Sequence, residues 1–347
     1  MGKIENIKDQ FDFIKYCMSR RTDERFKKIV YSIGDDYSLV NMEKHGELQT
    51  ERPIYYIAPD ASGSGFFSDF LRSLAYFYYA DNFDLIPVIK YPQGFCYSEN
   101  HEVLGTTNPY EYYFTQPGKY DLKIIDNAKC IVKARKENAA LVGQLNPSGH
   151  GYDYSSEYLD VLGNMVSKYI KFNEETDVYL RKAIDRVISQ NDRDRVLGVH
   201  VRGTDFKRNY KNHPMLITTE EYLKETKKVY SDNGYNRVFL ATDDTYALEI
   251  FKKEFGDNLI YFEDVIRSDG NETVMKSVNS RENHHYLLGL EVLRDAYTLG
   301  LCSGLVAGLS QVSTAARVLN RSSYCNSRYI DEDIIFKGIN KAGEICK

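Results

Sequence analysis

Apolar and polar residues follow the periods of strands and helices along much of the first half of the chain. Residues 53–59 and 85–89 are short apolar runs that predict two strands. Between them, a loop rich in Gly and Ser at 60–65 leads into apolar residues at helical spacing from Phe66 onward. Strand, loop, helix and strand in this order are the opening of an α/β domain. Residues 91–150 are rich in Tyr, Asn, Pro and Gly and predict long loops.

The second half follows the same pattern more regularly. Apolar runs predict four strands, and the segments between them carry apolar residues at helical spacing. Because strands and helices alternate, we expect a parallel, doubly wound sheet. The strands are predicted at 196–201, 238–241, 259–262 and 304–307, and the helices at 159–170, 180–188, 219–230, 246–255 and 287–301.

The length of the chain favours two domains, because 347 residues exceed what one hydrophobic core usually organises. The pattern divides into an N-terminal α/β domain at 1–175 and a C-terminal Rossmann-like domain at 176–347. The first 50 residues or so predict a helix with an irregular lead-in.

Composition excludes several classes of function. The net charge of −5 provides no overall attraction to nucleic acid or to anionic lipid. No run approaches the ~18 apolar residues of a membrane span, and the N-terminal residues lack the apolar core of a signal peptide. The six cysteines are scattered without a CxxC pair, so neither a zinc site nor a disulfide framework is indicated. We expect a cytoplasmic protein that binds no nucleic acid and has no integral membrane segment; a peripheral position at the inner membrane face is the alternative.

A polar motif ends the predicted strand at 196–201, at the edge where open α/β sheets bind ligands. It consists of residues 200–205, His-Val-Arg-Gly-Thr-Asp. His200 and Arg202 are two residues apart and therefore share one face of the strand. Arg202 carries a planar fork of donors that suits phosphate oxygens, and Gly203 lets a ligand approach the backbone. The alternative is an ordinary end of a sheet with an ion pair between Arg202 and Asp205.

Two adjacent carboxylates, Asp243 and Asp244, follow the next predicted strand. They suit hydrogen bonds from ribose hydroxyls or base nitrogens, and they are also suitable ligands of a divalent cation. Capping of the helix that begins near Thr245 is the alternative role. Beside the arginine motif, we expect one of the two to contact a nucleotide.

A third polar group begins in the predicted helix at 287–301, which carries two apolar stripes. Asp295 falls on the second stripe, where an unpaired charge is costly and requires a partner. After the last predicted strand, Ser310, Gln311 and Val312 open another helix. The backbone amides and hydroxyls of such a helix end suit a phosphate without a metal ion, and capping by Ser310 is compatible with that role.

In their order and spacing, these three groups resemble the fucosyltransferase superfamily, most closely the α-1,6-fucosyltransferases that modify N-glycan cores and rhizobial nodulation factors. The resemblance covers roughly 196–319, with a weaker similarity at 62–79. It implies a GT-B fold, in which two Rossmann-like domains face each other across a cleft. It also implies an inverting transfer of L-fucose from GDP-β-L-fucose, held by the C-terminal domain, to a hydroxyl of an oligosaccharide or lipid-linked glycan, without a cofactor.

The resemblance assigns roles to individual residues. Arg202 matches the arginine that grips the β-phosphate, and His200 matches the histidine that precedes it. One or both of Asp243 and Asp244 would face guanine or ribose. Asp295, Ser310, Gln311 and Val312 match the segments that line the nucleotide and the diphosphate. Gly203 is expected to lie against the donor because it leaves the backbone open.

The catalytic base is the point at which this chain departs from the family. The α-1,6 enzymes carry a glutamate five residues after the motif aspartate, where this chain has Tyr210, and a second basic residue where it has Gly203. We expect Asp205 to accept the proton; Glu102, His213 and Tyr210 are the alternatives. Two alternative functions stay open. One is a transferase for another nucleoside-diphosphate sugar, and the other is an inactive carbohydrate- or nucleotide-binding module.

Overall fold

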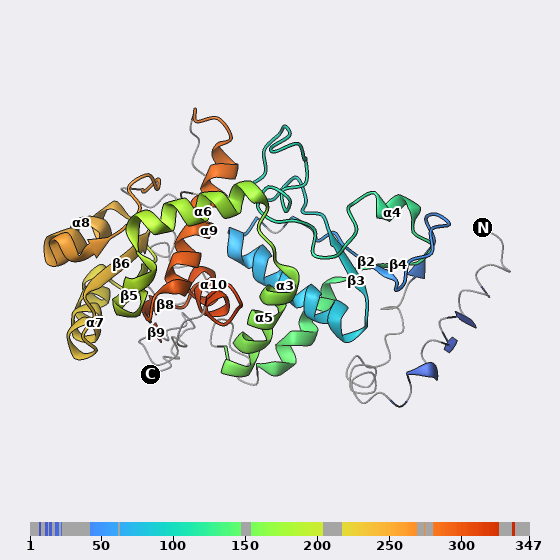
Figure 1. The fold of residues 1–347 in the computed structure, drawn as a ribbon, viewed down its shortest axis with the longest axis horizontal. Coiled ribbons are helices and arrows are strands. Elements are labelled where there is room, and N and C mark those ends of the chain that lie inside the picture. Colours follow the sequence, from blue (N-terminus) through green and yellow to red (C-terminus); the bar gives the residue numbers. More distant parts are fainter. Residues whose placement is uncertain are drawn as a thin grey trace, which may run out of the picture.

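The computed structural model describes residues 42–61, 63–146, 154–203, 217–268, 280–325 and 335–336, together with residue 274 and single residues between 7 and 22. Most of the helix predicted in the first 50 residues lies outside these ranges. The described elements form two α/β halves that lie side by side along the long axis of the molecule (Figure 1). No helix in the described ranges is long and apolar enough to cross a membrane.

The first half is built on a four-stranded sheet with the order β1-β4-β2-β3. Strand β2 is parallel to both β3 and β4, and only β1 runs antiparallel to its neighbour β4. Helix α3 connects β2 to β3 and buries almost every apolar side chain that it carries. The elements are β1 (Met42–Glu43), β2 (Ile54–Ile57), α3 (Phe66–Asn82), β3 (Ile86–Ile89), α4 (Ile124–Asn127), β4 (Ile131–Lys133) and the 3₁₀ helix η2 (Lys136–Leu145).

The prediction of long loops at 91–150 is correct up to about residue 123 and wrong beyond it. There the structure contains α4, β4 and η2, and β4 is the strand that pairs with β2. Only three residues long, β4 is too short to show the two-residue period by which a strand is recognised in a sequence. Its Ile131 is nevertheless completely buried.

The second half contains a fully parallel sheet with the order β7-β6-β5-β8-β9, as the doubly wound pattern predicted. The chain moves outward from β5 to β6 and β7, then returns to the other side of β5 with β8 and β9. The junction of β5 and β8 is therefore the topological switch point. The elements are β5 (Val196–Val201), α7 (Thr219–Asp232), β6 (Arg237–Thr242), α8 (Thr245–Phe255), β7 (Leu259–Ile260), α9 (His284–Leu301), β8 (Gly304–Gly308), α10 (Gln311–Asn320) and β9 (Ile335–Phe336).

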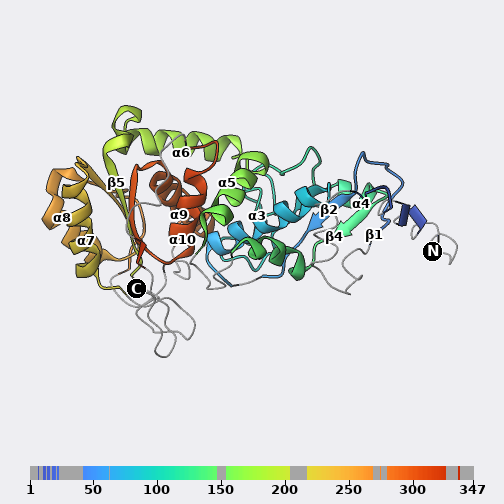
Figure 2. The same cartoon turned by 90° about the horizontal axis from the view of Figure 1, so that it is seen from below.

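Successive side chains of this sheet point to opposite faces, and both faces are covered. On one face, Leu197, Val199 and Val201 pack in the same cluster as residues of α7 and α8. On the other face, α9 and α10 cover the sheet (Figure 2). Because His200 alternates with Val199 and Val201, its ring points toward the face of α9 and α10.

The two halves share one hydrophobic core. A single cluster of buried side chains runs from Tyr55 in the first sheet through α3 to α9, α10 and Leu305 in the second sheet. Helices α5 (Ser156–Tyr169) and α6 (Glu174–Val187) connect the halves, and α5 packs against both α3 and α10. The boundary predicted at residue 175 falls at the start of α6, between the last strand of the first sheet and the first strand of the second.

Helix α9 makes a close contact with the loops of the first half. The Tyr113 hydroxyl donates a hydrogen bond to the backbone oxygen of Tyr286 at 3.1 Å, and the two rings stack. A Cβ atom added at Gly289 would lie 2.0 Å from the Tyr113 hydroxyl, so this contact requires glycine. The Glu99 carboxylate also accepts a hydrogen bond from the Tyr286 amide at 3.0 Å. The loops that follow β3 are thus fixed against the start of α9.

Candidate functional site

Two of the predicted groups meet at the switch point of the second sheet. His200, the residue before the last of β5, is buried, and its Nδ1 lies 3.3 Å from the Ser310 hydroxyl. Ser310 is the N-cap of α10 and accepts a hydrogen bond from the Ser313 amide at 3.1 Å. The strand that leads to Arg202 and the N-terminus of α10 are therefore directly connected by buried side chains.

A tyrosine that the sequence analysis did not single out holds the same two strand ends. Tyr222 of α7 is buried, and backbone groups of Gly308 and Arg202 hydrogen-bond its hydroxyl. A Cβ atom at Gly308 would lie 2.3 Å from that oxygen. Burial raises the pKa of Tyr222, so the hydroxyl stays neutral at any ordinary pH. Tyr222 thus fixes the positions of the backbone on which Arg202 and Ser310 depend.

Gly203 has a structural reason to be glycine. A Cβ atom at this position would lie 2.5 Å from the Cβ of Asp244 and 2.6 Å from its Oδ2. The Asp244 side chain therefore accounts for glycine at this position, and the approach of a ligand to the Gly203 backbone stays a prediction. The Gly203 amide donates a hydrogen bond to the Asp243 carboxylate at 3.2 Å, which ties the end of β5 to the end of β6.

The two adjacent carboxylates have different roles in the structure. Asp244 is buried and caps α8 by accepting a hydrogen bond from the Tyr246 amide at 2.9 Å. Asp243 is only partly buried and accepts from Gly203, beside the partly buried Arg202. The capping role that the sequence offered as the alternative is therefore confirmed for Asp244. The nucleotide contact stays a prediction, and Asp243 is the carboxylate better placed for it.

The start of α10 leaves polar groups available. The Oε1 atom of Gln311 is buried and has no hydrogen-bond partner among the residues that the structure describes. Buried amide oxygens are nearly always paired, so this atom is suited to a donor supplied by a ligand. The Val312 side chain is buried in the core, which leaves its backbone amide, in the first turn of the helix, as the group that could contact a ligand.

Asp295 lies in a cluster of charges beside α9. Desolvation raises its pKa to about 7, and the positive charges of Arg294 and Arg267 oppose this shift. Arg294 is 2% exposed, makes two hydrogen bonds of 3.0 and 2.7 Å to the Asp264 carboxylate, and stacks 3.8 Å above the Phe262 ring. The sequence predicted that Asp295 requires a partner, and the structure provides two guanidinium groups nearby.

This charge cluster is connected to the strand ends by one short segment. Asp264 and Arg267 lie in the chain that follows β7, and one residue later the Ser268 amide donates to the backbone oxygen of Asp243 at 2.9 Å. Sequence reasoning missed Asp264, Arg267 and Arg294. The signal available was Arg294 itself, a third charged residue beside Glu291 and Asp295 in a largely apolar helix.

The first half contributes one wall of the site. Tyr97 is buried, its ring lies 5.5 Å from that of Phe66 at the start of α3, and its hydroxyl hydrogen-bonds the Phe66 backbone. Burial raises the pKa of Tyr97 to about 12, and the charges of Arg202 and Asp243 act on it from nearby in opposite directions. The loops at the carboxyl end of the first sheet therefore approach the carboxyl end of the second.

Some predicted residues cannot be placed in this arrangement. Asp205, the expected base, and the alternatives Tyr210 and His213 lie outside the described residues. Glu102 is described and is exposed. Within the described ranges, no three His, Cys, Asp or Glu side chains are grouped so as to hold a metal ion.

No family model matches the chain, and no curated protein does. Solved structures do match. The NodZ α-1,6-fucosyltransferase soaked with GDP-fucose is 16% identical over 77% of this chain and 93% of its own, with a TM-score of 0.45. The fucosyltransferase NodZ from Bradyrhizobium matches the same shares at 16% identity and a TM-score of 0.44. POFUT1 in complex with GDP is 9% identical over 83% of this chain and 99% of its own, with a TM-score of 0.48. The two NodZ structures are described as fucosyltransferases.

Proposed function

We propose that this protein is an inverting glycosyltransferase that transfers L-fucose from GDP-β-L-fucose to a hydroxyl of an oligosaccharide or lipid-linked glycan. The observation that carries the proposal is that the end of β5, which leads into Arg202, meets the N-terminus of α10 through His200 and Ser310 at the switch point of a parallel sheet. In open α/β sheets this is where nucleotides bind.

The diphosphate of the donor would lie between Arg202 and α10. A guanidinium group matches phosphate oxygens, and the first amides of a helix point at an anion with the positive end of the helix dipole behind them. In the transition state, negative charge accumulates on the departing diphosphate, and these pre-placed groups stabilise it. We propose that they do so without a metal ion and without a cofactor.

The nucleoside would lie along the polar residues on the α9 face. Asp243 is suited to the ribose hydroxyls, and Asp295 to the N–H donors of guanine. Desolvation already raises the pKa of Asp295, so its carboxylate gains strongly from donors that a ligand provides. The Gln311 oxygen is a further acceptor, which suits a hydroxyl of the donor rather than the diphosphate, whose oxygens only accept.

The transfer itself exchanges two bonds at the anomeric carbon. The acceptor oxygen forms a bond to this carbon while the bond to the β-phosphate oxygen breaks, and the proton of the acceptor hydroxyl passes to a carboxylate. We propose Asp205 as that carboxylate, because it follows Arg202 by three residues, just beyond the end of β5. Asp205→Asn should lower the rate constant by roughly two to four orders of magnitude and leave GDP affinity nearly unchanged.

A thermal-shift panel of GDP, UDP, ADP and their sugars tests the function as a whole. A nucleotide that binds the folded state raises the melting temperature by mass action, and we expect GDP and GDP-fucose to do so most. A larger shift with UDP or ADP would favour a transferase for another nucleoside-diphosphate sugar. Binding of GDP-fucose without hydrolysis or transfer would favour the inactive binding module.

A further inference from the structure

The charge cluster beside α9 contains as many carboxylates as guanidinium groups, but they do not all form ion pairs. Its members are Asp264, Glu291 and Asp295, with Arg267, Arg281 and Arg294. Arg294 donates two hydrogen bonds to Asp264, and Nη1 of Arg281 lies 2.5 Å from the Glu291 carboxylate. One carboxylate, that of Asp295, is left outside these two pairs.

The remaining guanidinium group does not pair with Asp295 either. Arg267 donates to the backbone oxygens of Phe262 and Val265, at 2.8 and 3.2 Å. The positive charges of Arg267 and Arg294 attract the Asp295 carboxylate from nearby. In the described part of the chain, however, no donor lies within hydrogen-bond distance of it. Asp295 is thus a carboxylate among cations that are already engaged with other acceptors.

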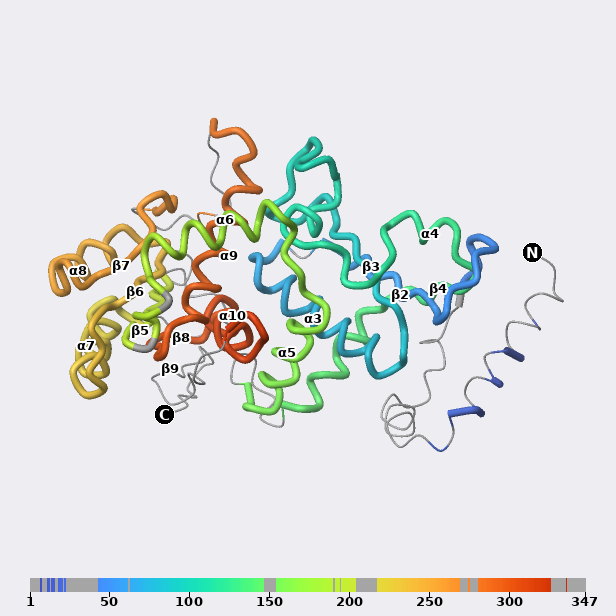
Figure 3. The backbone as a smooth tube through the Cα atoms, in the orientation of Figure 1, coloured from blue at the N-terminus to red at the C-terminus, as the bar shows by residue number. Residues whose placement is uncertain are grey.

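The surroundings of Asp295 disfavour its charged form. Glu291 lies one turn away on the same face of α9, and Asp264 adds a second negative charge. Helix α6 crosses this part of α9 (Figure 3) and contributes Tyr179, whose ring centre lies 5.5 Å from the Arg294 guanidinium. A carboxylate that is removed from water without a donor is costly as an anion, so it tends to hold a proton. Desolvation accordingly raises the pKa of Asp295 to about 7.

A ligand can reverse this preference. Asp295 is half-buried, so its carboxyl group stays within reach. Hydrogen bonds from N–H donors stabilise the ionised form, and guanine carries two such donors, N1–H and the N2 amino group, on one edge. We propose that binding of a guanine nucleotide at Asp295 expels the proton of its carboxyl group to the solvent, so that donor affinity depends on pH. This inference rests on the proposed function, in which the nucleoside lies beside Asp295.

The proton balance gives the direction of the effect. Below about pH 7 the free protein carries the proton on Asp295 and the complex does not, so close to one proton is released for each nucleotide bound. Affinity should therefore rise with pH, by up to about tenfold per pH unit below pH 7. It should level off above about pH 8, where the free carboxylate is already ionised.

Isothermal titration calorimetry of the full chain with GDP-fucose counts the protons. Neither phosphate of GDP-fucose is terminal, so neither titrates near neutral pH, unlike the terminal phosphate of GDP. At about pH 6, in two buffers with different ionisation enthalpies, the heats of binding should differ by the amount expected for about one released proton. At about pH 8 the two buffers should give the same heat.

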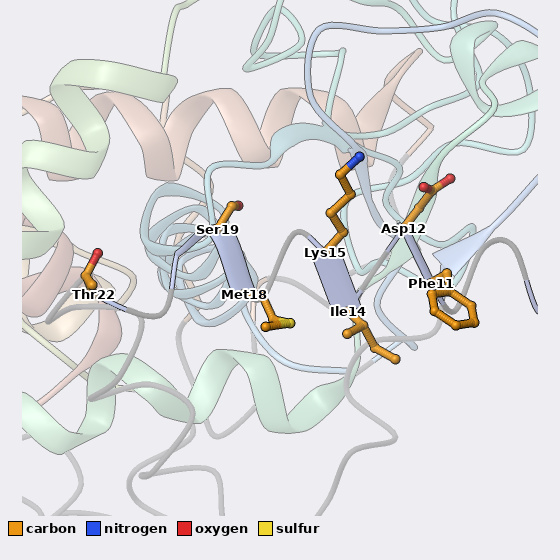
Figure 4. Close-up of a pocket in the computed structure, with 7 residues that line it drawn as sticks. All are labelled: Phe11, Asp12, Ile14, Lys15, Met18, Ser19 and Thr22. Carbon is orange, nitrogen blue, oxygen red and sulfur yellow. The ribbon is translucent and has the colours of Figure 1, made fainter.

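Three variants separate Asp295 from other titrating groups. Asp295→Asn keeps the size of the side chain and an acceptor oxygen but cannot ionise, so the difference between the buffers should vanish and the affinity should become nearly independent of pH. Asp264→Asn removes a negative charge that acts on Asp295 and keeps an acceptor oxygen for Arg294, so the rise in affinity should move to lower pH. Asp12 lines a surface pocket near the N-terminus (Figure 4), at the end of the molecule remote from the second sheet. Asp12→Asn is the matched control for charge and should leave the pH dependence unchanged.

The outcomes distinguish this inference from the proposed function. If GDP-fucose binds with equal heats in both buffers at about pH 6, the inference is overturned and the proposed function stands. Proton release that persists in Asp295→Asn would overturn it as well, because another group would then be the source. Absence of GDP-fucose binding at every pH would overturn both.

Discussion

The contact between Gly308 and Tyr222 allows a quantitative test of how the candidate site is built. A methyl group at Gly308 would overlap the Tyr222 hydroxyl at 2.3 Å, while the next atoms, Cδ1 of Ile217 and Cζ of Tyr222, are 3.1 and 3.5 Å away. The hydroxyl is therefore the main obstacle to the substitution, and Cδ1 of Ile217 must also move by a few tenths of an ångström. Forcing an extra methyl into a packed site costs about 1–3 kcal/mol, partly offset by ~0.4–1 kcal/mol from the loss of glycine flexibility in the unfolded chain. We expect Gly308→Ala to lower the free energy of unfolding by about 1–2 kcal/mol.

Tyr222→Phe removes the hydroxyl and should itself cost about 1–3 kcal/mol, because backbone groups of Gly308 and Arg202 lose their buried partner. In the double variant, however, the new methyl occupies the space that the hydroxyl left. The two costs should then fall short of additivity by ~1–2 kcal/mol, which is the range seen for residues in direct contact.

Urea denaturation followed by circular dichroism measures all four proteins of this cycle. Gly143→Ala is the matched control, because a Cβ atom there would meet no described atom within 4 Å. Combined with Tyr222→Phe, it should be additive. If Gly308→Ala and Tyr222→Phe are also additive within the error of the measurement, the hydroxyl does not lie between β5 and β8, and the positioning of Arg202 by Tyr222 is refuted.

Three further predictions concern the charges of the site. Arg202→Ala should lower the rate of transfer by about a hundredfold or more, since a contact that strengthens in the transition state is worth ~3 kcal/mol. Arg237 is an exposed arginine at the opposite end of β6, and Arg237→Ala should leave the rate unchanged. Equal rates for the two variants in a GDP-fucose transfer assay would reject the role of Arg202. Turnover should survive an excess of EDTA, and a loss that Mn²⁺ restores would argue for a metal. The pKa of Asp295 is raised to about 7 in the folded protein, whereas in the unfolded chain it is near 4. Between these two pH values the folded state binds more protons than the unfolded state, so the free energy of unfolding should fall as pH rises. Asp295→Asn should flatten that dependence in denaturation curves, and an unchanged slope would contradict it.

The elements that could be predicted from the sequence are those whose pattern is long enough to repeat. Strands β5, β6 and β8 are continuous apolar runs buried on both faces, and α7, α8 and α9 show several turns of helical spacing. The strands β1, β4 and β9 have two or three residues each and show no period. They exist because neighbouring strands offer them hydrogen bonds, which is a tertiary effect that local sequence does not encode.

The same distinction applies to the candidate site. The sequence predicted the motif at His200 and a partner for Asp295, and it offered capping as the alternative role of Asp244 and Ser310, because these follow from strand ends and helix periods. It gave no indication of Tyr97 or Tyr222, whose roles depend on contacts between residues far apart in the chain. Nor did it indicate that the Asp244 side chain requires glycine at position 203.

The fit between Gly289 and Tyr113 limits how such a chain can recombine with a relative. A chimera that took its second half from a homologue with any other residue at position 289 would drive a side chain into the Tyr113 hydroxyl. The two positions are 176 residues apart and lie on opposite sides of the predicted boundary at 175, yet they must be inherited together. Crossovers between them should yield folded protein only when both parents carry the same pair, so a library of chimeras sorted for folding would reveal this linkage.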